Sequence, residues 1–79
     1  MTGNQLRAAR SLLGWSQAQV AEAAGISVPT VKRAEGQGQL KASESAVKSI
    51  QSVLEDAGVE FLPGNGKGEG VRLKKGVSG

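Results

Sequence analysis

The sequence contains no cysteine, no histidine and no tyrosine. The missing cysteine excludes disulfides and cysteine-ligated zinc, and the missing histidine removes the commonest general base and metal ligand. Among the carboxylates, Glu55 and Asp56 are adjacent, and neighbours on a helix point in different directions. We therefore expect a protein that is not an enzyme and that uses no metal ion, cofactor or small-molecule ligand.

Aromatic residues and long apolar runs are also scarce. Trp15 and Phe61 are the only aromatic residues, so the core must be built from leucine, valine, isoleucine and alanine, which suits short, closely packed helices. No apolar run reaches the length of a membrane span, and Met1 is not followed by a signal-peptide pattern. These absences predict a cytoplasmic protein without membrane contact. Because 79 residues are few for one core, oligomerisation is an expected source of stability.

The net charge of +3 is distributed unevenly along the chain. Residues 1–42 hold five basic and two acidic residues, and residues 63–79 hold four basic and one acidic. Residues 43–62 hold one basic and four acidic residues, so an acidic segment separates two basic ends. A basic excess of this kind fits a polyanionic partner, and it is also common on solvated surfaces.

Hydrophobic periodicity and capping residues predict four helices, at about 4–13, 16–25, 27–36 and 43–58. Gly14 and Gly25 are expected to end the first two helices in a left-handed conformation. Ser16 and Gln19 have the spacing of a capping box. After residue 58 the period changes to two, which predicts two short strands at 59–62 and 71–74.

The glycine-rich stretch at residues 64–70 allows two interpretations. Its glycines are compatible with a phosphate-binding loop, but it lacks the lysine and hydroxyl residue that end a P-loop, and no helix follows it. A loop that joins the two strands is therefore favoured. Residues 76–79 are expected to form a disordered tail.

Residues 16–36, SQAQVAEAAGISVPTVKRAEG, resemble the helix-turn-helix of the phage repressor and Cro family, often called the Xre family. The features that carry the resemblance are an opening Ser-Gln, a small residue at the helix crossing, a turn glycine, apolar wedge residues and a closing Ala-Glu-Gly: Ser16, Gln17, Ala21, Gly25, Val20, Ile26, Val31 and 34–36. The resemblance extends back to Arg10 and Trp15. Residues 58–75 are also similar to the tail of many small bacterial members.

The resemblance implies a mainly α fold, a four-helix lambda-repressor-like helix-turn-helix domain with a short C-terminal β-hairpin. It implies a DNA-binding domain at residues 1–58, followed by a strand pair at 59–75. It also implies a bacterial, cytoplasmic transcriptional regulator that associates with the nucleoid through double-stranded DNA.

In such a domain the second helix of the motif enters the major groove. Carried over by position, the candidates for base contacts are Ser27, Val28, Pro29, Thr30, Lys32 and Arg33, and those for phosphate contacts are Ser16, Gln17, Arg7, Arg10 and Lys41. Arg33 has the donors for a bidentate contact with guanine. The alternatives are ordinary ones: Ser27 caps the helix, Pro29 starts it, and Lys32 and Arg33 form a solvated face.

Arg10 and Glu35 match a pair of positions that many family members occupy with an arginine and a glutamate. Besides the phosphate contact, Arg10 therefore has a second predicted role in a partly buried ion pair that ties the third helix to the core. The structural role is favoured. Loss of either partner would leave an uncompensated charge.

A single recognition helix reads only a few base pairs, so a homodimer on a two-fold-related site is expected. The fourth helix and the strand pair are the candidate surfaces, and we favour the strands, through Val59, Phe61, Val71 and Leu73. The basic run of Arg72, Lys74 and Lys75 has the alternative of lying along the DNA backbone as a wing. The alternative function is a protein-binding adaptor or an antitoxin-type regulator that holds a regulatory protein partner.

Overall fold

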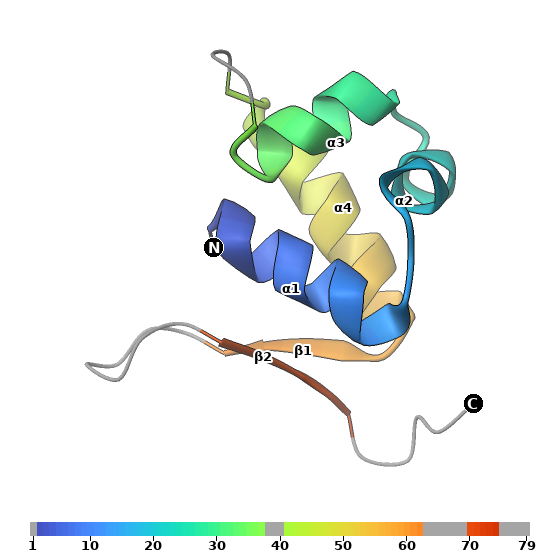
Figure 1. The fold of residues 1–79 in the computed structure, drawn as a ribbon, viewed down its shortest axis with the longest axis vertical. Coiled ribbons are helices and arrows are strands. Elements are labelled where there is room, and N and C mark those ends of the chain that lie inside the picture. Colours follow the sequence, from blue (N-terminus) through green and yellow to red (C-terminus); the bar gives the residue numbers. More distant parts are fainter. Residues whose placement is uncertain (1, 38–40, 63–69, 75–79) are drawn as a thin grey trace.

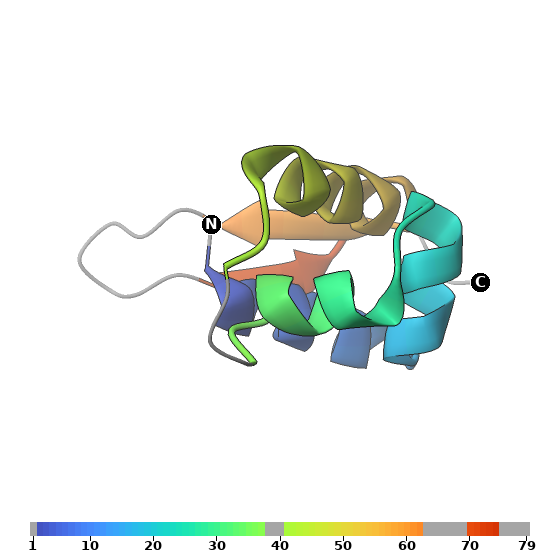
Figure 2. The same ribbon diagram turned by 90° about the horizontal axis from the view of Figure 1, so that it is seen from above.

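The computed structural model of the protein describes residues 2–37, 41–62 and 70–74. Its elements are α1 (Gly3–Leu13), α2 (Gln17–Ala24), α3 (Val28–Ala34), α4 (Glu44–Asp56), β1 (Val59–Leu62) and β2 (Gly70–Leu73). The mainly α fold with a C-terminal hairpin is thereby confirmed. In Figure 1, α1 lies between α3 on one side and the two strands on the other, and Figure 2 shows α3 lying over α1. None of the helices in the described ranges is both long and apolar enough to cross a membrane.

Local sequence signals set most of the helix ends. Ser16 and Gln19 form the expected capping box at α2, and Gly14 and Gly25 adopt left-handed conformations with φ of 69° and 70°. A second capping box, formed by Thr2 and Gln5, starts α1 at Gly3, one residue before the predicted start. Most of the predicted 64–70 loop, Lys75 and the predicted tail at 76–79 lie outside the described residues.

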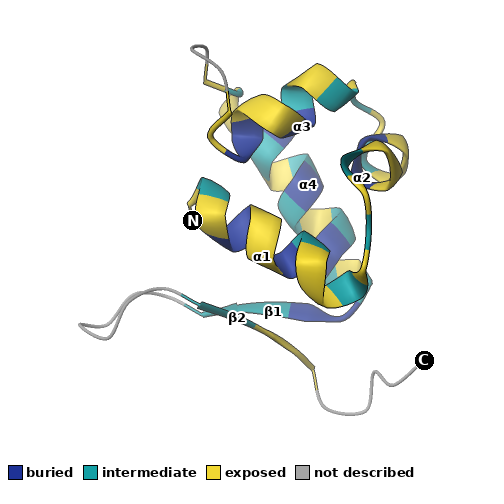
Figure 3. Cartoon of the chain, in the orientation of Figure 1, coloured by how far each residue is buried: buried dark blue, intermediate teal, exposed yellow. Residues whose placement is uncertain are grey.

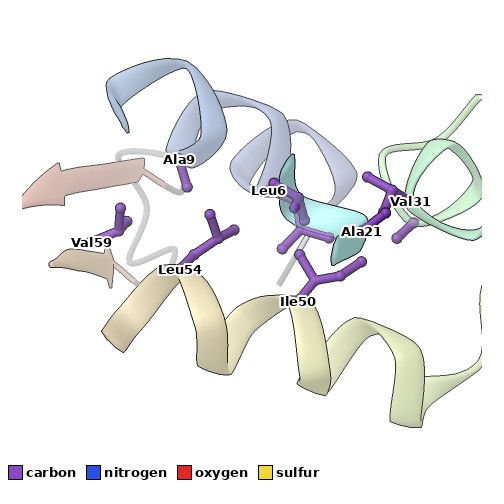
Figure 4. Close-up of a cluster of buried hydrophobic side chains, with 9 residues drawn as sticks. Leu6, Ala9, Ala21, Val31, Ile50, Leu54 and Val59 are labelled. Carbon is purple, nitrogen blue, oxygen red and sulfur yellow. The ribbon is translucent and has the colours of Figure 1, made fainter. Parts of the chain in front are cut away.

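The core takes side chains from the four helices and from β1. Figure 4 shows them converging between α1 and α4, with α2 and α3 closing one end. The fully buried residues include Leu6, Val20, Val31, Ile50, Leu54 and Val59. Val59 is 0% exposed, so β1 belongs to the same core as the helices. The side chain of Val59 is therefore not accessible to a second copy, whereas the other strand residues predicted for a dimer contact, Phe61, Val71 and Leu73, keep part of their surface accessible.

The two strands pair antiparallel, with Phe61 opposite Val71. The buried side chain of Gln5 holds them against α1. Its Nε2 donates to the carbonyl oxygens of Leu62 and Gly70, each at 3.0 Å, while its Oε1 accepts from the backbone N–H of Thr2 at 3.0 Å. One amide therefore joins the start of α1 to both strands.

Candidate nucleic-acid interface

The helix α3 has one face in the core and one face in solvent. Val31 and Ala34 are buried, whereas Pro29, Lys32 and Arg33 are exposed; Figure 3 shows the exposed surface of α3 on the side away from α1 and the strands. This division follows from helical periodicity, because the residues three apart at 31 and 34 share a face. The outward face of α3 therefore carries two cationic side chains beside an apolar proline ring.

The start of α3 is fixed by hydrogen bonds of hydroxyl groups. Ser27 is the N-cap, and its Oγ accepts from the backbone N–H of Thr30 at 3.2 Å. The Ser27 Oγ also lies 2.8 Å from the Thr30 Oγ1. Whichever hydroxyl donates in that contact, the proton of the other remains available to an outside acceptor. Val28 is half-buried and packs on the core, so it presents less surface than its neighbours.

The end of α3 is anchored to α1 by an ion pair. The Nε of Arg10 lies 2.8 Å from Oε2 of Glu35, its Nη2 donates to Oε1 at 3.1 Å, and its Nη1 donates to the carbonyl oxygen of Trp15 at 3.0 Å. The side chains of Arg10 and Glu35 are 19% and 2% exposed. Because its Nε, Nη1 and Nη2 all donate to groups of the protein, Arg10 forms the predicted ion pair, and its contact with a phosphate stays a prediction.

The same carboxylate also binds α2. The Nε2 of Gln17 donates to Oε1 of Glu35 at 3.1 Å and to Oε1 of Gln37 at 3.3 Å. Gln17 is the first residue of α2, so Glu35 joins the last turn of α1, the start of α2 and the end of α3. The sequence predicts Gln17 as a phosphate contact or as a solvated residue of the first turn, and it gives no sign of the contact with Gln37, because the residues that Gln17 binds are 18 and 20 positions away.

The remaining candidates for phosphate contacts lie on the surface. Ser16 is exposed and its Oγ accepts from the backbone N–H of Gln19 at 3.1 Å. Arg7 is exposed and donates to Oδ1 of Asn4 at 2.7 Å, and Lys41 is exposed at the approach to α4. These residues come from three places in the chain: Arg7 from α1, Ser16 from the N-cap of α2, and Lys41 from the segment before α4.

The basic residues of the hairpin lie elsewhere. Arg72 and Lys74 belong to the strand region, which is separated from α3 by α1 (Figure 1). Arg72 binds Glu60 at 2.6 Å, and this hydrogen bond holds the pKa of the Glu60 carboxyl below its usual value. A wing formed by Arg72 and Lys74 beside the α3 face is therefore not supported.

Within residues 2–37, 41–62 and 70–74, no three histidine, cysteine, aspartate or glutamate side chains come together as metal ligands. Comparison with known proteins adds one finding: a sequence model described as a helix-turn-helix domain matches residues 3–59. The match runs from the first turn of α1 to the start of β1, and so includes all four helices. None of the curated proteins matches the chain.

Proposed function

The chain belongs to the helix-turn-helix domain family, and we propose that it is a sequence-specific regulator of transcription that binds double-stranded DNA as a homodimer. The family supports a DNA-binding regulator. The observation that carries the finer proposal is the outward face of α3, where Lys32 and Arg33 are exposed while Val31 and Ala34 anchor the helix. A solvated face accounts for the two exposed cations, but it does not account for the hydrogen bonds from α1 and α2 that hold Glu35 at the end of the same helix.

The proposed base contacts differ in their chemistry. Arg33 donates bidentately to a guanine, and Lys32 donates to a neighbouring guanine or to a phosphate. Pro29 has no donor and contacts a thymine methyl group. The hydroxyl pair of Ser27 and Thr30 supplies one O–H to a base or phosphate acceptor. Val28 contributes mainly by shape, because it is half-buried.

The proposed phosphate contacts come from Ser16, Arg7, Lys41 and the backbone N–H of Gln17, since both side-chain N–H groups of Gln17 already donate within the protein. They are supported by the exposure of the two cations and by the start of α2, whose partial positive charge favours a phosphate. Phosphate contacts position the protein, whereas base contacts give it sequence preference. Such a regulator performs no catalysis and acts in the cytoplasm.

The test begins with selection of a preferred site from randomised double-stranded DNA, followed by affinity measurements over a range of salt concentrations. The logarithm of affinity should fall with the logarithm of salt by about 0.9 per phosphate contact. Arg33→Ala should weaken binding to the selected site by about 1–3 kcal/mol and leave binding to random DNA nearly unchanged.

Lys48→Ala is the matched control, because Lys48 is an exposed cation on α4. It should bind the selected site like the wild type. If selection yields no preferred sequence, or if Arg33→Ala binds the selected site with unchanged affinity, the specific-reader proposal is wrong. The protein-binding adaptor would then be the better interpretation.

A further inference from the structure

The end of α3 rests on the backbone of α1 at Gly3. A Cβ atom at this position would lie 2.7 Å from the carbonyl carbon of Glu35, 2.8 Å from its carbonyl oxygen and 2.9 Å from the carbonyl oxygen of Ala34. Carbon atoms in favourable contact are about 3.5–4.0 Å apart. The atoms that a side chain would meet are backbone atoms, so no rotamer change relieves the overlap. Glycine at position 3 is therefore required for the observed approach of α3 to α1.

The turn that contains Gly3 is held from the opposite side. The capping box of Thr2 and Gln5 fixes its backbone, and the Gln5 amide anchors it to the carbonyl oxygens of Leu62 and Gly70. The next residue, Leu6, is 1% exposed and lies in the core. The first turn of α1 is thus clamped to the hairpin, and it has little freedom to move away from α3.

We propose that Gly3 is a positioning residue for DNA recognition: the bare backbone at this point, held in place by Gln5, sets how closely the C-terminal end of α3 approaches α1 and hence the tilt of the Lys32–Arg33 face. The inference rests on the proposed function of α3. Gly3 itself has no proposed contact with DNA. It acts through the backbone of Ala34 and Glu35, immediately after the two cationic residues.

The clamp determines which element moves when a side chain is added at position 3. In Gly3→Ala, the backbone of the first turn of α1 is held by the hairpin and the core, whereas Glu35 is held to α1 and α2 through side-chain hydrogen bonds that can adjust, so we expect the end of α3 to be displaced outward. Arg33 is two residues from Glu35 and moves with it. A bidentate contact with a base depends on geometry, whereas attraction to phosphates is sequence-independent. Binding to the selected site should therefore suffer more than binding to random DNA.

The experiment compares three proteins on the selected DNA site and on random DNA: wild type, Gly3→Ala, and Gly3→Ala with Gln5→Ala. All are measured at a temperature where circular dichroism shows them fully folded. Gly3→Ala should lose about tenfold in the ratio of specific to random affinity, which corresponds to about 1.4 kcal/mol and lies within the range of one good base contact. Backbone amide NMR shifts of residues 31–35 should change in the same variant without DNA.

The double variant separates positioning from stability. Removing the Gln5 amide releases the first turn from Leu62 and Gly70, so this turn rather than α3 should give way. The double variant should melt at a lower temperature than Gly3→Ala and yet recover most of the specific-to-random ratio. If the ratio follows stability and falls further, the positioning role is wrong. It is also wrong if Gly3→Ala keeps the wild-type ratio and the wild-type amide shifts.

Ser11→Ala is the matched control, because Ser11 is an exposed residue of α1. This substitution introduces the same helix-favouring alanine into the same helix. It should leave the ratio and the shifts of residues 31–35 unchanged. Failure of the proposed function would look different, because the wild type itself would then show no preferred site. In that case the NMR shifts alone decide whether Gly3 sets the position of α3.

Discussion

Glu35 is the residue at which α1, α2 and α3 are joined. Its carboxylate is 2% exposed, and it accepts hydrogen bonds from Arg10 of α1 and from Gln17 of α2, while its backbone caps α3. A buried charge is costly without compensation. The arrangement is therefore stable only while these donors remain in place, and the position of α3 depends on them.

Arg10→Ala should lower the free energy of unfolding by about 3 kcal/mol, because it leaves the Glu35 carboxylate buried without a cation. Arg10→Lys should recover only part of this loss, since a lysine cannot donate bidentately to the carboxylate. Urea denaturation at neutral pH measures both effects.

The double variant Arg10→Met with Glu35→Leu provides the control for this prediction. Replacing both charges by apolar groups of similar size removes the uncompensated carboxylate, so this variant should be more stable than Arg10→Ala. If Arg10→Ala lowers the free energy of unfolding by less than about 1 kcal/mol, the range typical of exposed ion pairs, the Arg10–Glu35 pair does not anchor α3.

At the scale of elements, the hairpin is fastened to α1 by very few groups. Gln5 is the residue that donates to both strands, and Val59 is the hairpin residue that lies fully in the core. The side chains of Phe61 and Val71 are half-buried and pack against that core. The strands are therefore expected to open more readily than the helices.

Gln5→Leu should loosen the hairpin without unfolding the helices. Leucine keeps the position apolar and close in size, but it donates no hydrogen bond to Leu62 or Gly70. Hydrogen exchange of the amides in β1 and β2 should become faster, while the amides of α2 should exchange at the wild-type rate. Equal acceleration in all elements would mean that Gln5 supports the whole fold rather than the hairpin.

At the scale of the molecule, α3 and the hairpin lie on opposite sides of α1 (Figure 1). Among the described residues, the large exposed hydrophobic side chains are Leu12 of α1, at 44% exposure, and Leu73 of β2, at 43%. These two elements are neighbours in Figure 1. A dimer contact proposed at Leu73 leaves the outward face of α3 free for DNA.

Leu73→Lys should weaken the proposed homodimer by about tenfold or more, since a charge replaces an apolar side chain at the contact. The fold should be retained, because Leu73 is already largely accessible. Sedimentation equilibrium gives the dissociation constant. Ser52→Lys, at an exposed position of α4, adds the same charge elsewhere and should leave the constant unchanged; equal weakening by both variants would point to a general charge effect.

The sequence allowed prediction of the features that depend on local chemistry. The left-handed glycines at 14 and 25 and the capping box at Ser16 follow from residues only a few positions apart, and the structure contains them. The capping box of Thr2 and Gln5 has the same spacing and was equally predictable from the sequence. Gln5 also lies four residues before the buried Ala9, on the apolar face of the first helix. A polar side chain at such a position indicates a hydrogen-bond partner elsewhere in the fold.

Features that depend on distant backbone were not predictable. The Gln5 amide binds carbonyl groups 57 and 65 residues away, and any residue type at 62 or 70 provides such a group. The alternation of the strands placed Val59, Phe61, Val71 and Leu73 on one face, but it did not reveal that the helices bury Val59 completely while Leu73 stays 43% exposed. A period of two therefore predicts which residues share a face, but not which of them is buried by the helices.

The placement of α1 between α3 and the strands has a consequence for engineering. The residues at 29, 32 and 33 are exposed on α3, and the hairpin lies on the other side of α1 (Figure 1). They can be randomised in a library while the clamp at Gln5, the support at Gly3 and the core beneath stay constant. The chain is thus suited to serve as a small cysteine-free scaffold on which new binding preferences are selected.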